Sequence, residues 1–434
     1  GGGCEGGREG GETGGQSGSV GGKVAAVWPA ADGTAGRGGG CGAGRPATGG
    51  GRTKKANRRN GGDDNRHSGP PFVDPNEEYD GPGRTADANG ESPYFWTINY
   101  DKLSVEFNLK TESGLRALYD LVEEADVVVE NFRPGTAERL GIGYDDLRDV
   151  NDGLVYCSIS AFGETGPWSR RPGYDLLVQG TSGIMSVTGP EGGDPVKVGL
   201  PQTDLITAMW AAFGIVGSLF RRELTGEGDR IEIGMHDAAL PWLTKQAGKA
   251  FVGEETKRMG TKDPVLSPYQ AYPTADGYLN VGCANQKLWT ELCEAVDRPD
   301  LIDDERFGSN PDRVANMDEL EDELSAVFRE RPTEEWVELL AEDHGLPVGP
   351  VYDVATALDN EQTEARGVIR EIEHPALGVV PVIEHPLNYE HATAGFEEAP
   401  PLLGEDTEAI LDGLGYDGGD IERLREEGAI PDDD

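Results

Sequence analysis

The chain has 434 residues, of which 36% are hydrophobic, enough for two or three folded domains. Its 80 acidic against 38 basic residues give a formal net charge of −42, which argues against nucleic acids and membrane surfaces as partners. Such an acidic excess is typical of proteins that work in high salt. The five cysteines form no CxxC pair and no metal-ligand spacing, so we expect no disulfide framework, no metal site and a reducing, cytoplasmic location.

Residues 1–60 differ in composition from everything that follows. They contain Gly-rich runs such as GGGCEGGREGGETGG, are basic rather than acidic, and show no hydrophobic period. Such a segment predicts no packed core. Two interpretations stay open: a disordered natural tail, or a frameshifted segment of a GC-rich gene. The second is favoured because Gly, Arg, Ala and Pro are what GC-rich codons give in an unselected frame.

From Tyr94 onward, strand and helix patterns alternate. LSVEFNL alternates apolar and polar residues as a strand does, residues 111–124 have the period of an amphipathic helix, and ADVVVENF indicates a short buried strand. Strand and helix in turn predict a parallel sheet of Rossmann type, with ligands at the carboxyl ends of the strands. Asn131 and Phe132 lie at such an end.

The segment Leu205 to Phe220 carries no charge and is followed by Arg221 and Arg222. It predicts a buried helix with a basic C-terminal end. Asp204 falls where that helix would be capped, and the positive end of the helix dipole favours its ionised form. On local grounds a helix cap is the simplest interpretation of Asp204. An ionised carboxylate is also what a nucleophile requires.

A second α/β unit follows. YQAYPTADGYLNVGC predicts a hairpin around Asp276, and LWTELCEAV, residues 316–328 and residues 334–342 predict helices. The expected organisation is a Gly-rich segment (1–60), a large α/β domain (61–225), a linker (226–262), a small α/β domain (263–345), a second linker (346–405) and a C-terminal segment (406–434).

Several motifs occur in collinear order from about Gly61 to the C-terminus: VENFRPGTAERLG, CSISAFGETGP, PGYDLLVQGTSG, GLPVGPVYDVATAL and APPLLGEDTEAIL. Together they resemble the class III CoA-transferases, the family of formyl-CoA transferase and carnitine CoA-transferase. The resemblance implies an α/β fold with a Rossmann-type large domain that binds CoA, a smaller α/β domain and long linkers. It also implies that residues 406–434 return to the large domain and that the protein forms homodimers whose chains thread through one another. Members open with a strand, a loop and a helix that approach the CoA nucleotide. No such pattern precedes Gly61, so the large domain is expected to be incomplete at its N-terminus.

The resemblance also implies a mechanism. An aspartate attacks the thioester of an acyl-CoA, an aspartyl anhydride and then an aspartyl-CoA thioester form, and a carboxylic acid takes over the CoA. Asp204 falls on that aspartate. Coenzyme A enters as part of a substrate, so no permanently bound cofactor is expected. The positions that fall on CoA-binding positions, or beside the reacting groups, are Lys110, Asn131, Phe132, Arg139, Tyr174 and Met235.

Each of these residues also has an ordinary structural interpretation, from solvated lysine to core methionine, and His236 beside Met235 is interpreted as a packing or surface histidine. Two functional alternatives stay open. One is an α-methylacyl-CoA racemase, an enzyme of the same fold whose pattern has a His-Asp acid–base pair. Tyr174 occupies the position of that histidine, and a phenol with pKa about 10 is a poor base near neutrality. The other alternative is an inactive product of a damaged gene. The glycine-rich flap of formyl-CoA transferase has no counterpart in this sequence, which disfavours formyl-CoA and oxalyl-CoA as substrates. A small dicarboxylate such as succinate, carried as succinyl-CoA, is then the expected donor.

Overall fold

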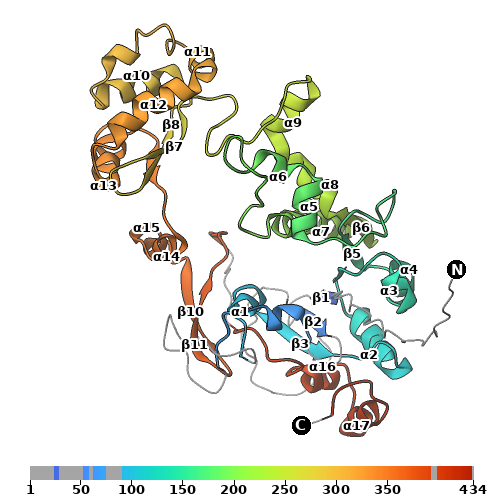
Figure 1. Cartoon of the computed structure of the whole chain (residues 1–434). Coiled ribbons are helices and arrows are strands. Elements are labelled where there is room, and N and C mark those ends of the chain that lie inside the picture. The colour runs from blue at the N-terminus through green and yellow to red at the C-terminus, as the bar shows by residue number, and fades with distance from the viewer. Residues whose placement is uncertain (1–23, 29–51, 58–61, 75–89, 392–397, 433–434) are drawn as a thin grey trace, which may run out of the picture.

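A computed structural model describes residues 24–28, 52–57, 62–74, 90–391 and 398–432 (Figure 1). The large unit is built on a six-stranded sheet with the order β3-β2-β1-β4-β5-β6. Its strands are β1 (Val24–Trp28), β2 (Arg52–Asn57), β3 (Lys102–Glu106), β4 (Val127–Glu130), β5 (Val155–Ser160) and β6 (Asp229–Gly234).

The sheet confirms the α/β architecture of Rossmann type. β2 is parallel to β3, and β4, β5 and β6 are parallel to one another, whereas β1 is antiparallel to both of its neighbours. The expectation that nothing before Gly61 joins the sheet is wrong for β1 and β2. Strands of five and six residues surrounded by glycine are too short to show a hydrophobic period. The rest of the segment 1–60 lies outside the described residues.

Helices connect the strands and flank the sheet. The first ones are η1 (Asp64–His67), α1 (Pro93–Asn99), α2 (Glu112–Glu123), α3 (Thr136–Arg139) and α4 (Tyr144–Val150). They are followed by α5 (Asp175–Thr181), α6 (Ile184–Val187), α7 (Gln202–Thr225), α8 (Met235–Ala239), η2 (Leu240–Leu243) and α9 (Thr244–Phe251).

The C-terminal helices α16 (Thr407–Gly413) and α17 (Gly418–Glu426) pack on the large unit beside α2 and β3. Leu118 and Leu121 of α2 share one core with Leu411 and Leu424 of these helices. The turn before α16 also covers the edge of β3, where Ser104 N donates to Asp406 Oδ2 at 2.8 Å. An exposed strand edge invites pairing with another chain, so this turn protects the sheet.

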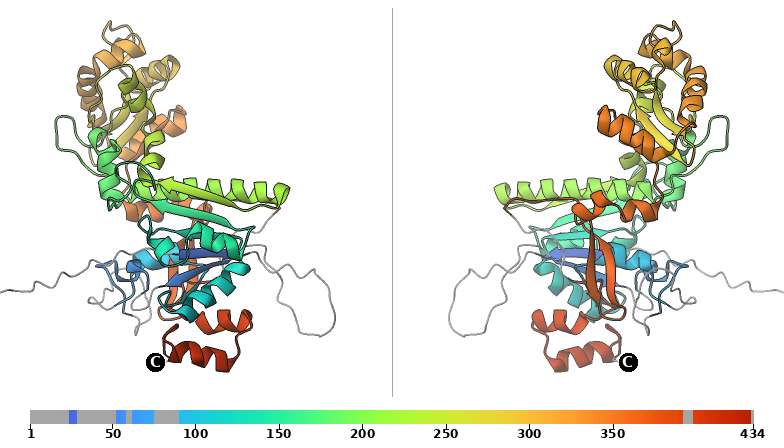
Figure 2. Two further views of the ribbon diagram at one scale, coloured as in Figure 1. Left: turned by 90° about the vertical axis from the view of Figure 1, so that its right-hand side faces the viewer. Right: turned by 90° about the vertical axis from the view of Figure 1, so that its left-hand side faces the viewer.

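The helix α7 is the longest in the described part of the chain and crosses the large unit beside β5 and β6 (Figure 2). It ends at Gly226, whose φ of +77° suits glycine and whose N–H donates to Arg222 O at 2.7 Å. By length and composition it is the one helix among the described residues that could cross a membrane, and 28% of its most apolar window is buried.

The prediction of a buried helix at Leu205 to Phe220 is therefore wrong. One side of α7 packs on α5, α8, β5 and β6, and the other side is open. Six apolar side chains, spaced three or four residues apart along that open side, are between 53% and 73% exposed. They are Leu205, Met209, Phe213, Val216, Phe220 and Leu224, and we call them the α7 stripe.

The small unit combines a three-stranded antiparallel sheet with helices around one core that includes Trp289, Leu324 and Phe328. The predicted hairpin around Asp276 is confirmed. The elements are β7 (Tyr269–Pro273), β8 (Tyr278–Gly282), α10 (Gln286–Ala295), η3 (Pro299–Leu301), α11 (Asn310–Ala315), α12 (Met317–Phe328), α13 (Thr333–Val337), the π-helix η4 (Glu338–Asp343) and β9 (Val348–Pro350).

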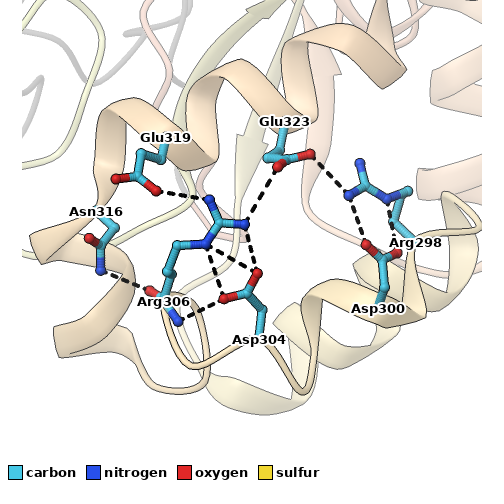
Figure 3. Close-up of polar contacts among 7 residues, drawn as sticks. All are labelled: Arg298, Asp300, Asp304, Arg306, Asn316, Glu319 and Glu323. Carbon is cyan, nitrogen blue, oxygen red and sulfur yellow. Dashed lines mark hydrogen bonds and ion pairs between the residues drawn. The ribbon is translucent and has the colours of Figure 1, made fainter.

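Ion pairs that share partners hold the surface of the small unit together (Figure 3). Glu323 bridges two arginines: it lies 3.0 Å from Arg298 and 3.6 Å from Arg306. Arg306 also pairs with Asp304 at 2.7 Å and with Glu319 at 2.8 Å. In this acidic chain one arginine side chain thus forms ion pairs with several carboxylates.

Two segments of the chain join the units (Figure 1). The predicted linker 226–262 contains β6, which belongs to the large sheet, so the large unit extends beyond residue 225. The second linker contains more regular structure than expected: α14 (Val354–Leu358), α15 (Glu361–Ala365) and a hairpin of β10 (Ile369–His374) and β11 (Gly378–Ile383).

Candidate active site

A cavity of about 440 Å³ lies at the carboxyl ends of β4, β5 and β6. This is where ligands bind in open α/β sheets. Five of the seven predicted site residues line it: Asn131 and Phe132 after β4, Tyr174 before α5, Asp204 on α7 and Met235 after β6. These five residues are up to 104 positions apart in the sequence, from Asn131 to Met235.

Asp204 is in the first turn of α7, not at its cap. The helix begins at Gln202, and the residue in the cap position is Pro201, whose side chain accepts no hydrogen bond. The capping carboxylate comes instead from Asp175 on α5, whose Oδ1 accepts hydrogen bonds from Thr203 N and Thr203 Oγ1, both at 2.9 Å. The end of α7 is therefore capped by another helix, and the Asp204 side chain is exposed at the cavity.

The turn after β4 is fixed by a buried carboxyl group. Glu130 is 4% exposed and its Oε2 accepts a hydrogen bond from Phe132 N at 2.7 Å. Burial raises the pKa of Glu130, while hydrogen bonds from Ser158 and Phe132 oppose that rise. Asn131 Nδ2 donates to Ile159 O at 2.8 Å, which ties the same turn to β5.

Both buried and exposed side chains line the rest of the cavity. Met235 is 7% exposed and packs in a cluster with Val178 and Ile184. Gly173 allows the loop before α5 to approach β5, because an added Cβ would lie 2.4 Å from Ala161 Cβ. Tyr174, by contrast, is 72% exposed at the rim.

The other two predicted residues do not line this cavity. Lys110 is exposed just before Thr111, the cap of α2. Arg139 ends α3, is exposed and donates from Nη2 to Thr136 Oγ1 at 2.8 Å. Their assignment to the CoA nucleotide stays a prediction.

His236 packs between aromatic rings. Its ring centroid lies 6.1 Å from that of Phe162 and 5.8 Å from that of Trp168. This arrangement fits a packing histidine. Over the described ranges, no group of three or more His, Cys, Asp or Glu side chains could hold a metal ion.

Asp175, Tyr94 and Ser160 are among the residues around the cavity that sequence reasoning missed. Asp175 was missed because its bonds to Thr203 span 28 positions and leave no local signal. Tyr94 of α1 is the second: it lines the cavity, and burial together with the nearby Asp204 carboxylate raises its pKa. The third is Ser160, the last residue of β5, which also lines the cavity.

Ser160 is 5% exposed, and its Oγ has no hydrogen-bond partner among the described residues. A buried hydroxyl without a partner costs about 1–3 kcal/mol. We therefore expect Ser160→Ala to weaken binding of a CoA ester about 5- to 30-fold, as a loss of about 1–2 kcal/mol implies, while the melting temperature of the free protein stays the same or rises. Calorimetric titration with a CoA ester measures the affinity, and a thermal melt measures the melting temperature.

Ser158→Ala is the matched control, since Ser158 lies two residues earlier in β5 and its hydroxyl already makes a hydrogen bond to the Glu130 carboxyl group. That change should lower the melting temperature. If Ser160→Ala lowers the melting temperature and leaves CoA affinity unchanged, the hydroxyl serves the fold and not a ligand.

Comparison with known proteins decides the family. The family model described as CoA-transferase family III matches residues 55–407. The chain belongs to CoA-transferase family III. This confirms that it is an acyl-CoA:carboxylate CoA-transferase, whose substrates include CoA thioesters.

Relatives of this CoA-transferase extend over most of its length. It is 38% identical over 378 residues to the succinyl-CoA:glutarate CoA-transferase of Mus musculus, covering 87% of this chain and 83% of that one. It is 34% identical to the succinyl-CoA:mesaconate CoA-transferase of Haloarcula marismortui, covering 81% and 87%. The crystal structure of a CAIB/BAIF family protein from Brucella suis superposes with a TM-score of 0.71 and 33% identity, covering 83% and 91%.

Proposed function

We propose that this CoA-transferase moves CoA from succinyl-CoA to a small dicarboxylic acid, with Asp204 as the nucleophile. The observation that carries the proposal is the cavity itself. It holds the Asp204 carboxylate together with Asn131, Phe132 and Met235, the residues expected to contact CoA.

The proposed chemistry proceeds in covalent steps on one carboxylate. Asp204 attacks the thioester carbon of the donor, the C–S bond breaks, and an aspartyl anhydride and CoA thiolate remain. The thiolate attacks the aspartyl carbonyl, which releases the donor acid as its carboxylate and leaves an aspartyl-CoA thioester. The acceptor carboxylate then reverses the two steps. Splitting one difficult exchange into easier attacks is the benefit of nucleophilic catalysis.

The relatives and the charges in the cavity support the substrate class. The mouse and Haloarcula relatives are named for succinyl-CoA and a dicarboxylic acceptor. Arg133 and Arg171 line the same cavity and supply positive charge to a second carboxylate. Monocarboxylates lack that second group.

A matrix of donors and acceptors tests this proposal. Succinyl-CoA, acetyl-CoA and oxalyl-CoA are each combined with glutarate, mesaconate, oxalate and butyrate, and the new CoA ester is measured by chromatography in high salt. We expect the largest kcat/KM for succinyl-CoA with glutarate or mesaconate. Faster transfer from acetyl-CoA, or to butyrate, would overturn the substrate assignment.

We further propose that the enzyme is a homodimer and that the α7 stripe lies in the interface. The stripe runs for about 28 Å at the 1.5 Å rise per residue of an α-helix. Contiguous exposed apolar surface of this kind marks protein interfaces. A second copy of the chain is the proposed partner because all six side chains are apolar and the chain is otherwise strongly acidic.

We also propose that the enzyme is cytoplasmic and adapted to high salt. The described cysteines, Cys157, Cys283 and Cys293, are buried free thiols. Shared ion pairs such as those of Lys262, whose Nζ lies 2.6 Å from Asp318 and 2.7 Å from Glu321, place carboxylates close together. Their mutual repulsion depends on screening by salt.

Lowering the salt concentration should therefore destabilise the fold. The screening length grows from about 3 Å at 1 M to about 10 Å at 0.1 M, so each carboxylate is repelled by many more neighbours. We expect the melting temperature to fall by roughly 10 °C or more over that range, measured by calorimetry. A sucrose series is the control, since sucrose stabilises folds without screening charge. A melting temperature independent of salt would contradict the adaptation.

A further inference from the structure

We propose that Gln179, which does not line the cavity, is a positioning residue for the nucleophile. It is completely buried and holds both the loop that precedes α7 and the carboxylate that caps α7. This inference rests on the proposed role of Asp204.

Both the nitrogen and the oxygen of the Gln179 amide group make hydrogen bonds. Its Nε2 donates to Asp175 Oδ2 at 2.7 Å and to Leu200 O at 3.2 Å, and its Oε1 accepts from Val198 N at 2.8 Å. Val198 is half-buried and packs against the cluster that includes Val178 and Ile184, whereas Leu200 is 62% exposed. Gln179 therefore holds the backbone of the loop at two points, Val198 N and Leu200 O, and the second point has little packing of its own.

The second half of the arrangement runs from Asp175 into α7. Asp175 Oδ1 accepts from Thr203 N and Oγ1, and Thr207 Oγ1 donates to Thr203 O at 2.6 Å. Thr203 is completely buried and immediately precedes Asp204. The backbone of the nucleophile is thus set by a chain of hydrogen bonds that begins at Gln179.

Gln179 also affects the electrostatics at the N-terminal end of α7. Two carboxylates share the N-terminal end of α7, because Asp175 Oδ1 accepts from Thr203 N and Asp204 is the next residue. Burial and, to a smaller extent, both carboxylates raise the pKa of Tyr94. The Gln179 amide is uncharged, so it donates a hydrogen bond to Asp175 without adding a charge beside the two carboxylates. The Asp175 carboxylate is therefore directed toward Gln179 and Thr203, and Asp204 is left to face the cavity.

Replacement of Gln179 should therefore reduce turnover and leave CoA binding intact. In Gln179→Glu the donors to Asp175 and Leu200 are lost, and two carboxyl oxygens meet at the 2.7 Å contact, where they repel each other unless they share a proton. Above neutral pH we expect kcat to fall about 10- to 100-fold, the scale that a nucleophile misplaced by about 1 Å produces. The KM for succinyl-CoA should change less than about twofold.

As the pH falls, the shared proton binds and activity should recover, giving an acid shift of the pH profile that the natural enzyme lacks. The other titratable groups near this contact are Asp204 on α7, Tyr94 on α1 and His236 on α8, whose Nδ1 lies 3.4 Å from Thr181 Oγ1. They are common to both proteins, so the difference between the two profiles isolates the introduced carboxyl group.

The experiment measures steady-state kinetics between pH 6 and 9 for the natural enzyme, Gln179→Glu and Thr203→Val. The threonine variant removes only one donor to Asp175 and should show a smaller loss of kcat. Gln362→Glu is the matched control, since Gln362 is exposed on α15 and should have no effect. Equal kcat and pH profile for Gln179→Glu and the natural enzyme would overturn the inference while CoA transfer stands.

Amide hydrogen exchange gives a readout that does not need activity. The amides of Val198 and Thr203 should be protected in the natural protein and should exchange faster in Gln179→Glu at pH 8. This outcome is expected even if the chain transfers no CoA. Unchanged protection in the variant would show that Gln179 does not hold the loop and would overturn the inference.

Discussion

Asp204→Asn should lose CoA-transferase activity by at least about 10⁴-fold, because the carboxylate that forms both covalent intermediates is gone. The fold should survive, since Asp175 and not Asp204 caps α7. The loss of one charge near the helix dipole should cost about 0.3–1 kcal/mol of stability. Steady-state turnover of succinyl-CoA with glutarate and a thermal melt measure both quantities.

Asp237→Asn is a matched control on α8, at the carboxyl end of β6 but outside the cavity lining. It should keep most of the activity. Substantial turnover by Asp204→Asn, above what contaminating natural enzyme explains, would remove Asp204 from the mechanism.

Phe213→Asp should convert the enzyme to monomers. Phe213 lies in the middle of the α7 stripe and is 66% exposed in the isolated chain, so the change disturbs no core of the monomer. In the proposed dimer it would bury an unpaired carboxylate, which costs several kcal/mol. We expect the dimer dissociation constant to rise by at least about 100-fold, as measured by analytical ultracentrifugation.

Tyr278→Asp is the control, since Tyr278 is 56% exposed on the hairpin of the small unit. It should leave the association state unchanged. A natural protein that sediments as a monomer, or a Phe213→Asp variant that remains a dimer, would contradict the assignment of the stripe to the interface.

Elements with strong local signals were predictable from the sequence. The helix α2 has an amphipathic period and Thr111 as its cap, and the hairpin at Asp276 has turn residues between alternating strands. The parallel pairing of β4, β5 and β6 also followed from alternating strand and helix patterns, although β1 and β2 were not predicted. Their few residues carry too little pattern to distinguish a strand from a Gly-rich segment.

Burial was harder to predict than helix formation. The residues from Leu205 to Phe220 do form a helix, but an apolar sequence does not say whether its partner is the same chain or another one. For that reason a helix expected in the core has an exposed apolar stripe in the isolated chain.

The candidate site was predictable where motifs mark strand ends, as at Asn131 and Phe132. It was not predictable where a contact joins distant segments. The bonds from Asp175 to Thr203 and from Gln179 to Val198 span 28 and 19 positions, and the unpartnered hydroxyl of Ser160 depends on what surrounds it in space. Local sequence does not encode such contacts.

The most direct test of the central claim is mass spectrometry of the peptide that carries Asp204 after brief incubation of the enzyme with succinyl-CoA alone. We predict a CoA adduct on Asp204 that disappears when glutarate is added, and a hydroxamate at the same residue when hydroxylamine is present. Full turnover with no adduct and no hydroxamate at Asp204 would contradict the covalent mechanism.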